Sequence, residues 1–322
     1  MNLQELKQKV LDGGLLGYDD AQRLCTAPLD ELCAAADEIR QHFCSNAFDL
    51  CTIVNGKCGR CSEDCKYCAQ SAHYPTHVEE YSLLSTQEIV QQARYNADRG
   101  VLRYSIVTSG KRLSNDEVDS VCESIRAVRR EVGIEVCVSF GLLDEEQFRK
   151  IKQAGASRVH CNLESSRRFF PSVCTTHTTD QKIATLQAAQ RAGLQVCSGG
   201  IMGLGETMAD RIDMALELRQ LGVKSVPVNF LNPIPGTPYV NNPPLSNEEK
   251  RRIIAVYRFL LPDASIRLAG GRGLLADKGR ACFLSGANAA ISGDMLTTAG
   301  ISIRTDMQLL DELGYHPQLW NK

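Results

Sequence analysis

Val101-Leu-Arg-Tyr-Ser-Ile-Val-Thr-Ser-Gly110 begins as a strand-like run, and a helical pattern at 115–132 connects it to a second such run at 134–140. The same alternation extends along most of the chain. Further strand-like runs lie at 49–55, 158–163, 194–201, 225–231, 265–269 and 287–292. Further helical patterns, several opened by Ser, Thr or Asp caps, lie at 86–99, 144–154, 180–192, 206–221 and 246–260. Eight strand-like runs alternating with helical patterns predict an α/β fold, a (β/α)8 barrel of the TIM type.

A doubly wound open sheet is the alternative fold, but no Gly-x-Gly-x-x-Gly turn or phosphate loop follows the first strand-like run. Residues 1–48 read as polar amphipathic helices, and we expect them to form an N-terminal helical cap. The predicted division of the chain is therefore a helical extension at 1–48, the barrel at 49–300, and a C-terminal helix and tail at 301–322.

The composition favours a small-molecule enzyme. With 36 basic and 38 acidic residues the net charge is −2, and no long run of one sign suggests nucleic-acid or membrane binding. The N-terminus lacks a secretion signal and no apolar window is long enough to span a membrane, so we expect a cytoplasmic protein. Fourteen cysteines in such a protein indicate metal ligation rather than a disulfide framework.

Three cysteines in the run Cys61-Ser-Glu-Asp-Cys65-Lys-Tyr-Cys68 carry the most specific chemical signal. Thiolates at C-x3-C-x2-C spacing can hold three irons of a cubane cluster and leave the fourth iron open. An open iron can bind and cleave a small molecule, whereas a fully ligated cluster only transfers electrons. The spacing therefore predicts a catalytic 4Fe–4S cluster on Cys61, Cys65 and Cys68.

A zinc knuckle is the alternative interpretation of this run, because Cys58 extends it to four cysteines and His73 and His77 follow closely. Zinc knuckles usually hold small irregular domains together. Here the run follows the apolar segment 49–54, which reads as a buried strand, and loops after strands are where α/β enzymes keep their active sites.

Polar residues follow several of the other predicted strands, at the end where barrel active sites collect. They are Thr108-Ser-Gly110, Asn162-Leu-Glu164, Gly199-Gly-Ile-Met-Gly-Leu-Gly-Glu206, Asn229 and Arg267.

These motifs resemble those of a known family. Cys61 to Cys68, with Tyr67 before the last cysteine, resembles the signature of radical S-adenosylmethionine enzymes, and 199–206 resembles their G-x-I-x-G-x-G-E strand. More narrowly, the chain is similar to the biotin synthase family from about Phe48 to Ala299. The matching segments are 61–70, Asn162-Leu-Glu164, Val196-Cys-Ser-Gly-Gly-Ile201, Val226-Pro-Val-Asn229, Gly236-Thr-Pro238, Ile266-Arg-Leu268 and Leu296-Thr-Thr298.

The resemblance implies sulfur insertion into dethiobiotin. In that family the open iron binds S-adenosylmethionine, whose reductive cleavage gives a 5′-deoxyadenosyl radical that abstracts hydrogen from unactivated carbon. Such C–H bonds are too weakly acidic for a side-chain base. A second, auxiliary cluster supplies the sulfur. The resemblance also implies an electron donor such as flavodoxin or ferredoxin, and a homodimer.

The resemblance also assigns individual residues. Asn162 matches the asparagine between cofactor ribose and substrate, and Glu164 stands where the family usually has an aspartate on the ribose hydroxyls. Lys182 falls where an arginine commonly pairs with the methionyl carboxylate, keeping the charge without the bidentate fork. Ile201 would pack against the adenine and Tyr67 would line the cofactor site. Asn229 matches a dethiobiotin-binding asparagine.

The auxiliary ligands depart from the well-known pattern of three cysteines and an arginine. Cys137, Cys197 and Arg267 match three of those positions, but Ser105 occupies the remaining cysteine position, and serine is a poor iron ligand beside thiolates. Cys51 stands where the family has a serine facing the same cavity. Because alternate strand residues share one face, Cys51, Cys137 and Cys197 could all point inward.

Three inward thiolates again leave one iron of a cubane open. We therefore expect a four-iron auxiliary cluster carrying an extra sulfide, in preference to a 2Fe–2S cluster. Cys161 and Cys174 are further candidate ligands, whereas we interpret five other cysteines as buried core residues: Cys25, Cys33, Cys44, Cys122 and Cys282.

Two other functions use similar sequences. Relatives of the hydrogenase-maturation or methylornithine type use the same barrel without sulfur insertion, and they need no sulfur-donating cluster. An iron–sulfur carrier that never cleaves S-adenosylmethionine is a third possibility, which the open-iron spacing and the 199–206 motif disfavour.

Overall fold

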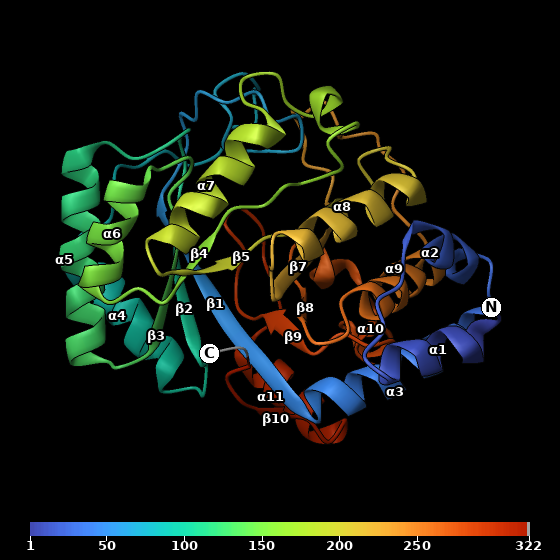
Figure 1. Cartoon of the computed structure of the whole chain (residues 1–322). Coiled ribbons are helices and arrows are strands. Elements are labelled where there is room, and N and C mark those ends of the chain that lie inside the picture. The colour runs from blue at the N-terminus through green and yellow to red at the C-terminus, as the bar shows by residue number, and fades with distance from the viewer. Residues whose placement is uncertain (321–322) are drawn as a thin grey trace.

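The strands form a closed ring of parallel pairs. The computed structural model describes residues 1–320 (Figure 1). Neighbouring strands pair in chain order, and β9 closes the ring by pairing with β1 at Asp49 and Ala289. The strands are β1 (Ala47–Lys57), β2 (Arg103–Thr108), β3 (Glu135–Ser139), β4 (Arg158–His160), β5 (Gln195–Cys197), β6 (Gly200–Met202), β7 (Ser225–Phe230), β8 (Ser265–Leu268) and β9 (Ala289–Ile291).

Strands β5 and β6 are successive parts of one position in the ring, since both pair with β7. The ring therefore has eight positions, each at one of the predicted strand-like runs. This closed parallel ring confirms the predicted (β/α)8 barrel and excludes the open sheet.

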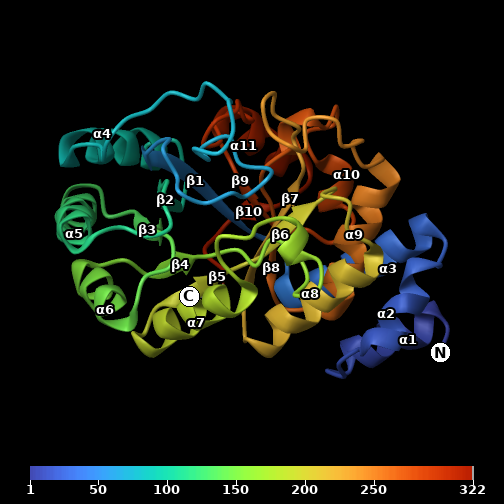
Figure 2. The ribbon, with the colours of Figure 1, turned by 90° about the horizontal axis from the view of Figure 1, so that it is seen from above.

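Helices surround the ring on its outside, as Figure 2 shows. The six predicted helices are α4 (Thr86–Ala97), α5 (Asn115–Glu131), α6 (Glu145–Ala154), α7 (Thr179–Arg191), α8 (Met208–Gln220) and α9 (Asn247–Leu260). Every one of them opens with a capping box, in which the N-cap side chain and the N3 side chain bond each other's backbone N–H. The N-caps are Ser85, Ser114, Asp144, Thr178, Thr207 and Ser246.

The N-terminal helices α1 (Leu3–Leu11), α2 (Tyr18–Cys25) and α3 (Leu29–Cys44) pack against this outer layer. Helix α3 contacts α9, and α2 contacts both α8 and α9 (Figure 1). After β8 come the 3-10 turn η2 (Arg272–Leu274) and the short helix α10 (Arg280–Phe283), while η1 (Phe170–Ser172) precedes α7.

The chain ends with α11 (Ile303–Glu312) and β10 (His316–Pro317), which pairs with the start of β1. Residues 321 and 322 of the predicted C-terminal tail lie outside the described residues.

Strand alternation separates two environments. Side chains such as Tyr104, Ile106 and Val136 belong to the apolar layer between strands and helices. Their neighbours Arg103, Ser105 and Cys137 line the barrel interior instead. The interior is therefore polar and sulfur-rich, and it holds a cavity rather than a packed core.

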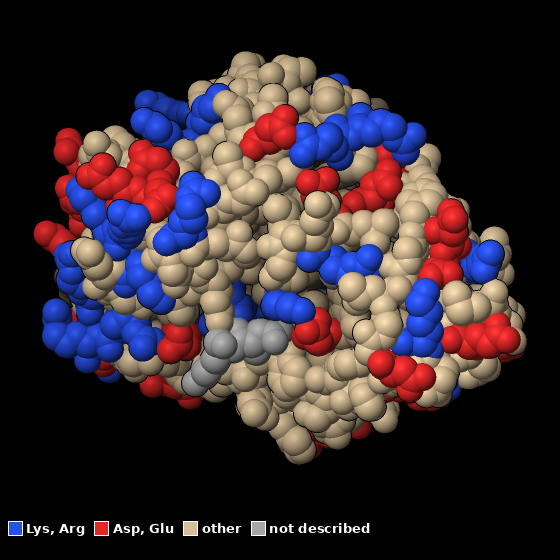
Figure 3. All heavy atoms as spheres, in the orientation of Figure 1, with Lys and Arg blue, Asp and Glu red and all other residues tan. Residues whose placement is uncertain are grey.

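On the face shown in Figure 3, acidic and basic side chains are interspersed. Among residues 1–320, no helix combines the length and apolar character needed to cross a membrane.

Candidate active site inside the barrel

One cavity of about 400 Å³ runs through the barrel interior. Cys61 and Cys68 line it together with three cysteines of the strands, Cys51, Cys137 and Cys197. The cysteines predicted for two different clusters thus face a shared space. Segment 295–298, from the loop after β9, also lines the cavity, and Asn55 Nδ2 donates to Leu296 O (3.0 Å).

The loop after β1 is held by its own backbone. Cys61 N donates to Gln70 O (3.0 Å), and Ala72 N donates back to Cys61 O (2.8 Å). Cys68 N closes a turn onto Cys65 O (3.0 Å). The three thiols of Cys61, Cys65 and Cys68 are half-buried. They are thus presented on a fixed loop beside the cavity, an arrangement that fits three ligands of a cubane cluster.

In the described residues, Cys58 and Cys61 do not gather into a group spaced for zinc. A tetrahedral zinc site needs sulfurs about 4 Å apart, because each Zn–S bond is about 2.3 Å long. Among the described residues, the group of three metal-binding side chains with ligand atoms within 4.8 Å is Cys65, Cys174 and His177, and it includes neither Cys58 nor Cys61. Cys58 instead forms a backbone bridge with Tyr81.

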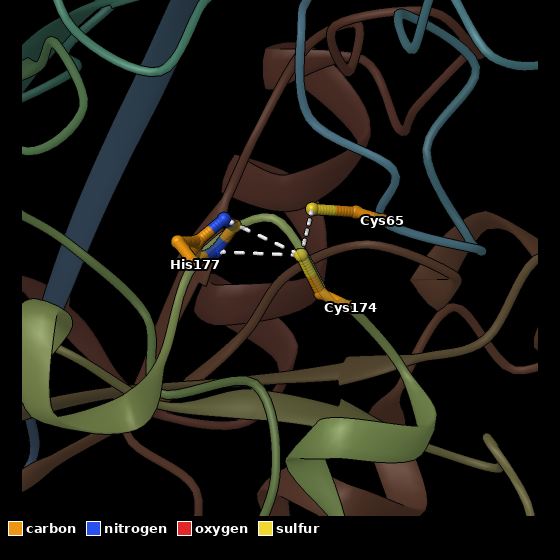
Figure 4. A group of neighbouring side chains, drawn as sticks. All are labelled: Cys65, Cys174 and His177. Atoms are coloured by element: carbon orange, nitrogen blue, oxygen red, sulfur yellow. Dashed lines mark hydrogen bonds between the residues drawn. The ribbon is translucent and has the colours of Figure 1, made fainter.

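Cys65 is oriented by a small network from the segment before α7, drawn in Figure 4. The Sγ atoms of Cys65 and Cys174 are 3.7 Å apart, and His177 Nδ1 lies 3.3 Å from Cys174 Sγ. His177 Nδ1 is also 2.6 Å from Glu63 Oε2. The contact with Cys65 is the main reason why the pKa of Cys174 falls to about 4. Cys174, a candidate auxiliary ligand in the sequence, therefore lies beside the Cys61–Cys68 loop.

The residues predicted to bind the cofactor gather around the ends of β4 and β5. Asn162 Oδ1 accepts from Gly199 N (3.0 Å), and Lys182 Nζ donates to the Asn162 carbonyl (2.9 Å). Burial is the main reason why the pKa of Tyr67 is raised, and the nearby Glu164 adds to this effect. Glu164 and Asn162 line the cavity, whereas Lys182 lines a smaller adjoining one of about 170 Å³.

The glycines of the 199–206 motif permit close strand packing. A Cβ on Gly199 would lie 1.9 Å from Pro227 O, and one on Gly200 would lie 2.5 Å from Glu164 O. Both clashes involve backbone atoms, so only glycine fits here. The adjacent Ile201 can consequently lie at the cavity wall, where its side chain is 9% exposed.

Glu206 closes the same motif. Its carboxylate accepts from Gly203 N (2.9 Å), Leu204 N (2.7 Å) and Arg211 Nε (2.7 Å). This fixes the loop that follows Ile201. Asn229 is similarly fixed, because Gly270 N donates to its Oδ1 (2.8 Å) and its Nδ2 donates to Gly200 O (3.1 Å).

Cys51, Cys137 and Cys197 come from β1, β3 and β5, and all three are buried. Arg267 Nη1 lies 3.1 Å from Cys51 Sγ. Burial opposes ionisation of Cys197, yet a hydrogen bond with His160 and the nearby positive charges bring its pKa down to about 7. Burial raises the pKa of Cys51 to about 12, and its ionisation there requires a positive partner such as a metal. Ser105 also lines the cavity, paired in register with Cys137.

Sequence reasoning missed a group of buried charged residues near these cysteines in the barrel interior. Asp49 is fully buried and pairs with Arg103 (3.1 Å), Arg158 (3.7 Å) and Arg267 (3.3 Å). The three arginines oppose the effect of burial and keep the pKa of Asp49 below its usual value. A charged residue within a predicted strand is a signal that could have identified Arg103 and Arg158, which lie in the strand-like runs 101–108 and 158–163.

His160 is a further residue of the site that the sequence did not single out. It lines the cavity, and its interaction with Cys197 helps to lower the pKa of that thiol. Cys161, the next residue, is buried against the outer apolar layer.

Comparisons with known proteins agree with this site. A model described as the Radical SAM superfamily matches residues 57–218, and one described as the Biotin and Thiamin Synthesis associated domain matches 227–316. The biotin synthase of Brachyspira hyodysenteriae is 57% identical over 319 residues, covering 99% of this chain and 96% of that protein. The biotin synthase of Akkermansia muciniphila is 58% identical over 314 residues, covering 98% of both chains. The chain belongs to the biotin synthase family.

Membership of the biotin synthase family implies a radical 4Fe–4S cluster with S-adenosylmethionine, and an auxiliary iron–sulfur cluster. Among solved structures, a methylornithine synthase matches with a TM-score of 0.84 at 20% identity, covering 98% of this chain and 97% of that one. An FeFe-hydrogenase maturase from Carboxydothermus hydrogenoformans matches with a TM-score of 0.82 at 18% identity, covering 98% and 79%. At these identities the two structures support the barrel fold alone.

Proposed function

We propose that this chain forms biotin by inserting sulfur into dethiobiotin, with the sulfur held at a four-iron auxiliary cluster. The observation that carries the proposal is the shared cavity, which Cys61 and Cys68 line together with Cys51, Cys137 and Cys197. A radical generated at one end could thus reach a substrate that also contacts a sulfur donor at the other.

When bound, the two clusters and S-adenosylmethionine supply radical cleavage of unactivated C–H bonds and a sulfur atom. The chain's own residues bind and orient the clusters and S-adenosylmethionine. Cys61, Cys65 and Cys68 hold the radical cluster, and the backbone of the 199–206 motif places Ile201 where it can pack against the adenine.

Tyr67 and Glu164 complete the cofactor side. The two residues lie close together, and Glu164 Oε2 is a buried oxygen with no hydrogen-bond partner in the described chain. A buried acceptor of this kind suits a ribose hydroxyl. Lys182, which contacts the Asn162 carbonyl, supplies the positive charge that pairs with the methionyl carboxylate.

Asn162 and Asn229 bind the substrate. Each amide already bonds backbone at the cavity wall, which fixes the side-chain orientation before a ligand arrives. A ureido ring has both donors and acceptors, and these amides offer complementary groups.

The four-iron assignment rests on Cys51 and Ser105. Both line the cavity, but only Cys51 supplies a thiolate, next to Cys137 and Cys197. Arg267, which contacts Cys51, serves as the charged neighbour of the cluster rather than as a required ligand.

Mössbauer spectroscopy with iron and sulfide analysis tests this proposal, using anaerobically reconstituted Cys61→Ala/Cys65→Ala/Cys68→Ala protein. We expect a four-iron signal at the remaining site, which Cys51→Ala abolishes and which Cys122→Ala, a core cysteine on α5, leaves intact. Iron and sulfide near 2:2 would contradict the four-iron cluster. Absence of biotin from the reconstituted wild type, with 5′-deoxyadenosine still released, would contradict sulfur insertion.

The fold neighbours of the hydrogenase-maturation and methylornithine types do not support an alternative function, because their sequence identities are far below those of the biotin synthases. A flavodoxin or ferredoxin donor, the homodimer, the cytoplasmic location and the division at residues 1–48, 49–300 and 301–322 stay predictions.

A further inference from the structure

A group of side chains able to bind a single metal ion lies at the Cys61–Cys68 loop. Within residues 1–320, Cys65, Cys174 and His177 form the group of three whose ligand atoms all lie within 4.8 Å of one another (Figure 4). The other two predicted ligands of the radical cluster, Cys61 and Cys68, are not part of it. Cys174 and His177 have no part in the proposed reaction, so their position around Cys65 calls for a separate function.

The two sulfurs of this group have the spacing of a tetrahedral metal site. Zn–S bonds about 2.3 Å long place two sulfurs of one tetrahedron about 4 Å apart. The Sγ atoms of Cys65 and Cys174 are 3.7 Å apart. One ion between them could therefore bind both sulfurs with little movement of either side chain.

His177 is oriented as a third ligand. Its Nδ1 lies 2.6 Å from Glu63 Oε2, so the carboxylate can accept the Nδ1 proton. The other ring nitrogen, Nε2, then keeps its lone pair and lies 3.9 Å from Cys174 Sγ, close to the S–N spacing of about 3.5 Å around a zinc ion. Metal-binding histidines commonly have a carboxylate that fixes the tautomer in this way. Both His177 and Glu63 are buried.

Backbone contacts hold the two cysteine segments together on both sides of the sulfur pair. On one side Lys66 N donates to Val173 O (3.1 Å). On the other side Thr175 N donates to Asp64 Oδ1 (2.8 Å). Neither contact involves a sulfur, so the ligands are held in place by the surrounding chain and need little reorganisation to bind an ion.

The ligand types favour zinc. Thiolate and imidazole bind zinc in preference to hard cations such as magnesium, and zinc lies above ferrous iron in the divalent affinity series. Cys174 is buried, whereas Cys65 is half-buried, so solvent reaches the group from the Cys65 side. Water can therefore supply the fourth ligand, a common arrangement where three protein ligands hold zinc.

We propose that Cys65, Cys174 and His177 bind one Zn²⁺ in protein that lacks the radical cluster, and that this ion has to leave before the cluster assembles. Zinc binds thiolates, so an Sγ proton still present is released to solvent on binding, and no electron is transferred. The two occupancies exclude each other because both use the sulfur of Cys65. The zinc site goes beyond the proposed function and depends neither on sulfur insertion nor on the size of the auxiliary cluster.

The test uses the full chain with Cys51, Cys137 and Cys197 replaced by alanine, so that the barrel thiols bind no metal. This cluster-free parent is titrated anaerobically with Zn²⁺ against a chromophoric chelator, under a phosphine reductant that keeps the thiols reduced. We expect one tightly bound zinc per chain. Co²⁺ in place of zinc should give a thiolate charge-transfer band and tetrahedral d–d bands.

Three variants of this parent identify the ligands. Cys174→Ala and His177→Gln should each weaken zinc binding at least ten-fold, and Cys174→Ala should lose the cobalt charge-transfer intensity of one thiolate. Cys61→Ala removes a radical-cluster ligand outside the group, so it is the matched control and should bind zinc as tightly as the parent. Equal weakening in Cys61→Ala and Cys174→Ala would overturn the site, because the ion would then be held by the loop cysteines.

Reconstitution of the radical cluster from iron and sulfide tests the competition. Zinc bound beforehand should slow cluster assembly at least five-fold in the parent and have no effect in Cys174→Ala. Equal rates with and without zinc in the parent would overturn the exclusion of one occupancy by the other.

If circular dichroism shows that the parent with three alanines does not fold, the wild-type chain gives the answer as a difference. Cys174→Ala should then bind one zinc fewer per chain than Cys61→Ala, because the barrel thiols contribute equally to both. Equal zinc contents would overturn the proposal.

Discussion

Arg267 on β8 donates a hydrogen bond to the Sγ of Cys51 on β1 over 3.1 Å, although 216 residues separate them in the chain. The same Nη1 also contacts the carbonyls of Asp49 (2.7 Å) and Ala290 (3.0 Å). One guanidinium thus joins the closing strands of the barrel to a proposed cluster ligand.

Arg267→Met should destabilise the cluster-free protein strongly. The substitution removes these bonds and leaves the buried Asp49 with one fewer cation, which costs about 3–5 kcal/mol. Urea unfolding monitored by circular dichroism measures the loss. Arg60→Met, at an arginine whose side chain is 84% exposed, should change stability by less than about 0.5 kcal/mol. Equal midpoints for the two variants would contradict the prediction.

Exchanging the side chains of residues 51 and 105 should change the auxiliary site. Cys51→Ser/Ser105→Cys restores the ligand pattern of the well-known biotin synthases, with position 105 adjacent to Cys137 in register. We expect second-site iron in the radical-cluster triple mutant to fall from four to two per chain. Mössbauer spectra and iron analysis check this. Four irons in the exchanged variant would show that Cys51 does not determine the size of the cluster.

Glu206→Gln should loosen the loop after Ile201. Glutamine keeps the shape but loses the charge-assisted bond with Arg211, so the free energy of unfolding should fall by about 2 kcal/mol. We also expect weaker S-adenosylmethionine binding, measured by equilibrium dialysis. Glu217→Gln, which alters a partly exposed pair with Arg167, is the matched control. Unchanged S-adenosylmethionine affinity in Glu206→Gln would mean that this loop does not contribute to cofactor binding.

Asp210 should make stability depend on pH in the acid range. It is 3% exposed, and although burial opposes ionisation, bonds from Ser166, Thr207 and Arg168 lower its pKa from 3.8 to about 2. A lowered carboxyl pKa stabilises the fold above pH 4, and this stabilisation is lost as the pH falls toward 2. We therefore expect Asp210→Asn to cost about 2 kcal/mol at pH 7.

Urea unfolding of cluster-free protein at pH 7 and pH 3 measures this difference. The deficit of Asp210→Asn should shrink at the lower pH, whereas the exposed Asp19→Asn should show none at either. A deficit that stays constant would mean that the charge of Asp210 does not contribute.

Local chemistry made much of this protein predictable from its sequence. Helix starts need only a capping residue and its partner three positions later, so 86–97, 115–131 and 145–154 could be placed from neighbouring residues. The Cys61–Cys68 spacing is likewise local, because one loop carries all three thiols. The count of alternating elements was sufficient to predict a barrel.

Tertiary structure decided what meets inside that barrel. Strands dispersed over more than 200 residues contribute Cys51, Cys137, Cys197 and the three arginines around Asp49. Only closure of the ring brings these side chains into the same cavity. Cys174 shows the same limit, because its position beside Cys65 depends on how the segment before α7 folds back over the barrel. Sequence determines which strand face a side chain occupies, through the two-residue period; which side chains it then faces across the interior depends on strand stagger and closure, which no local pattern encodes.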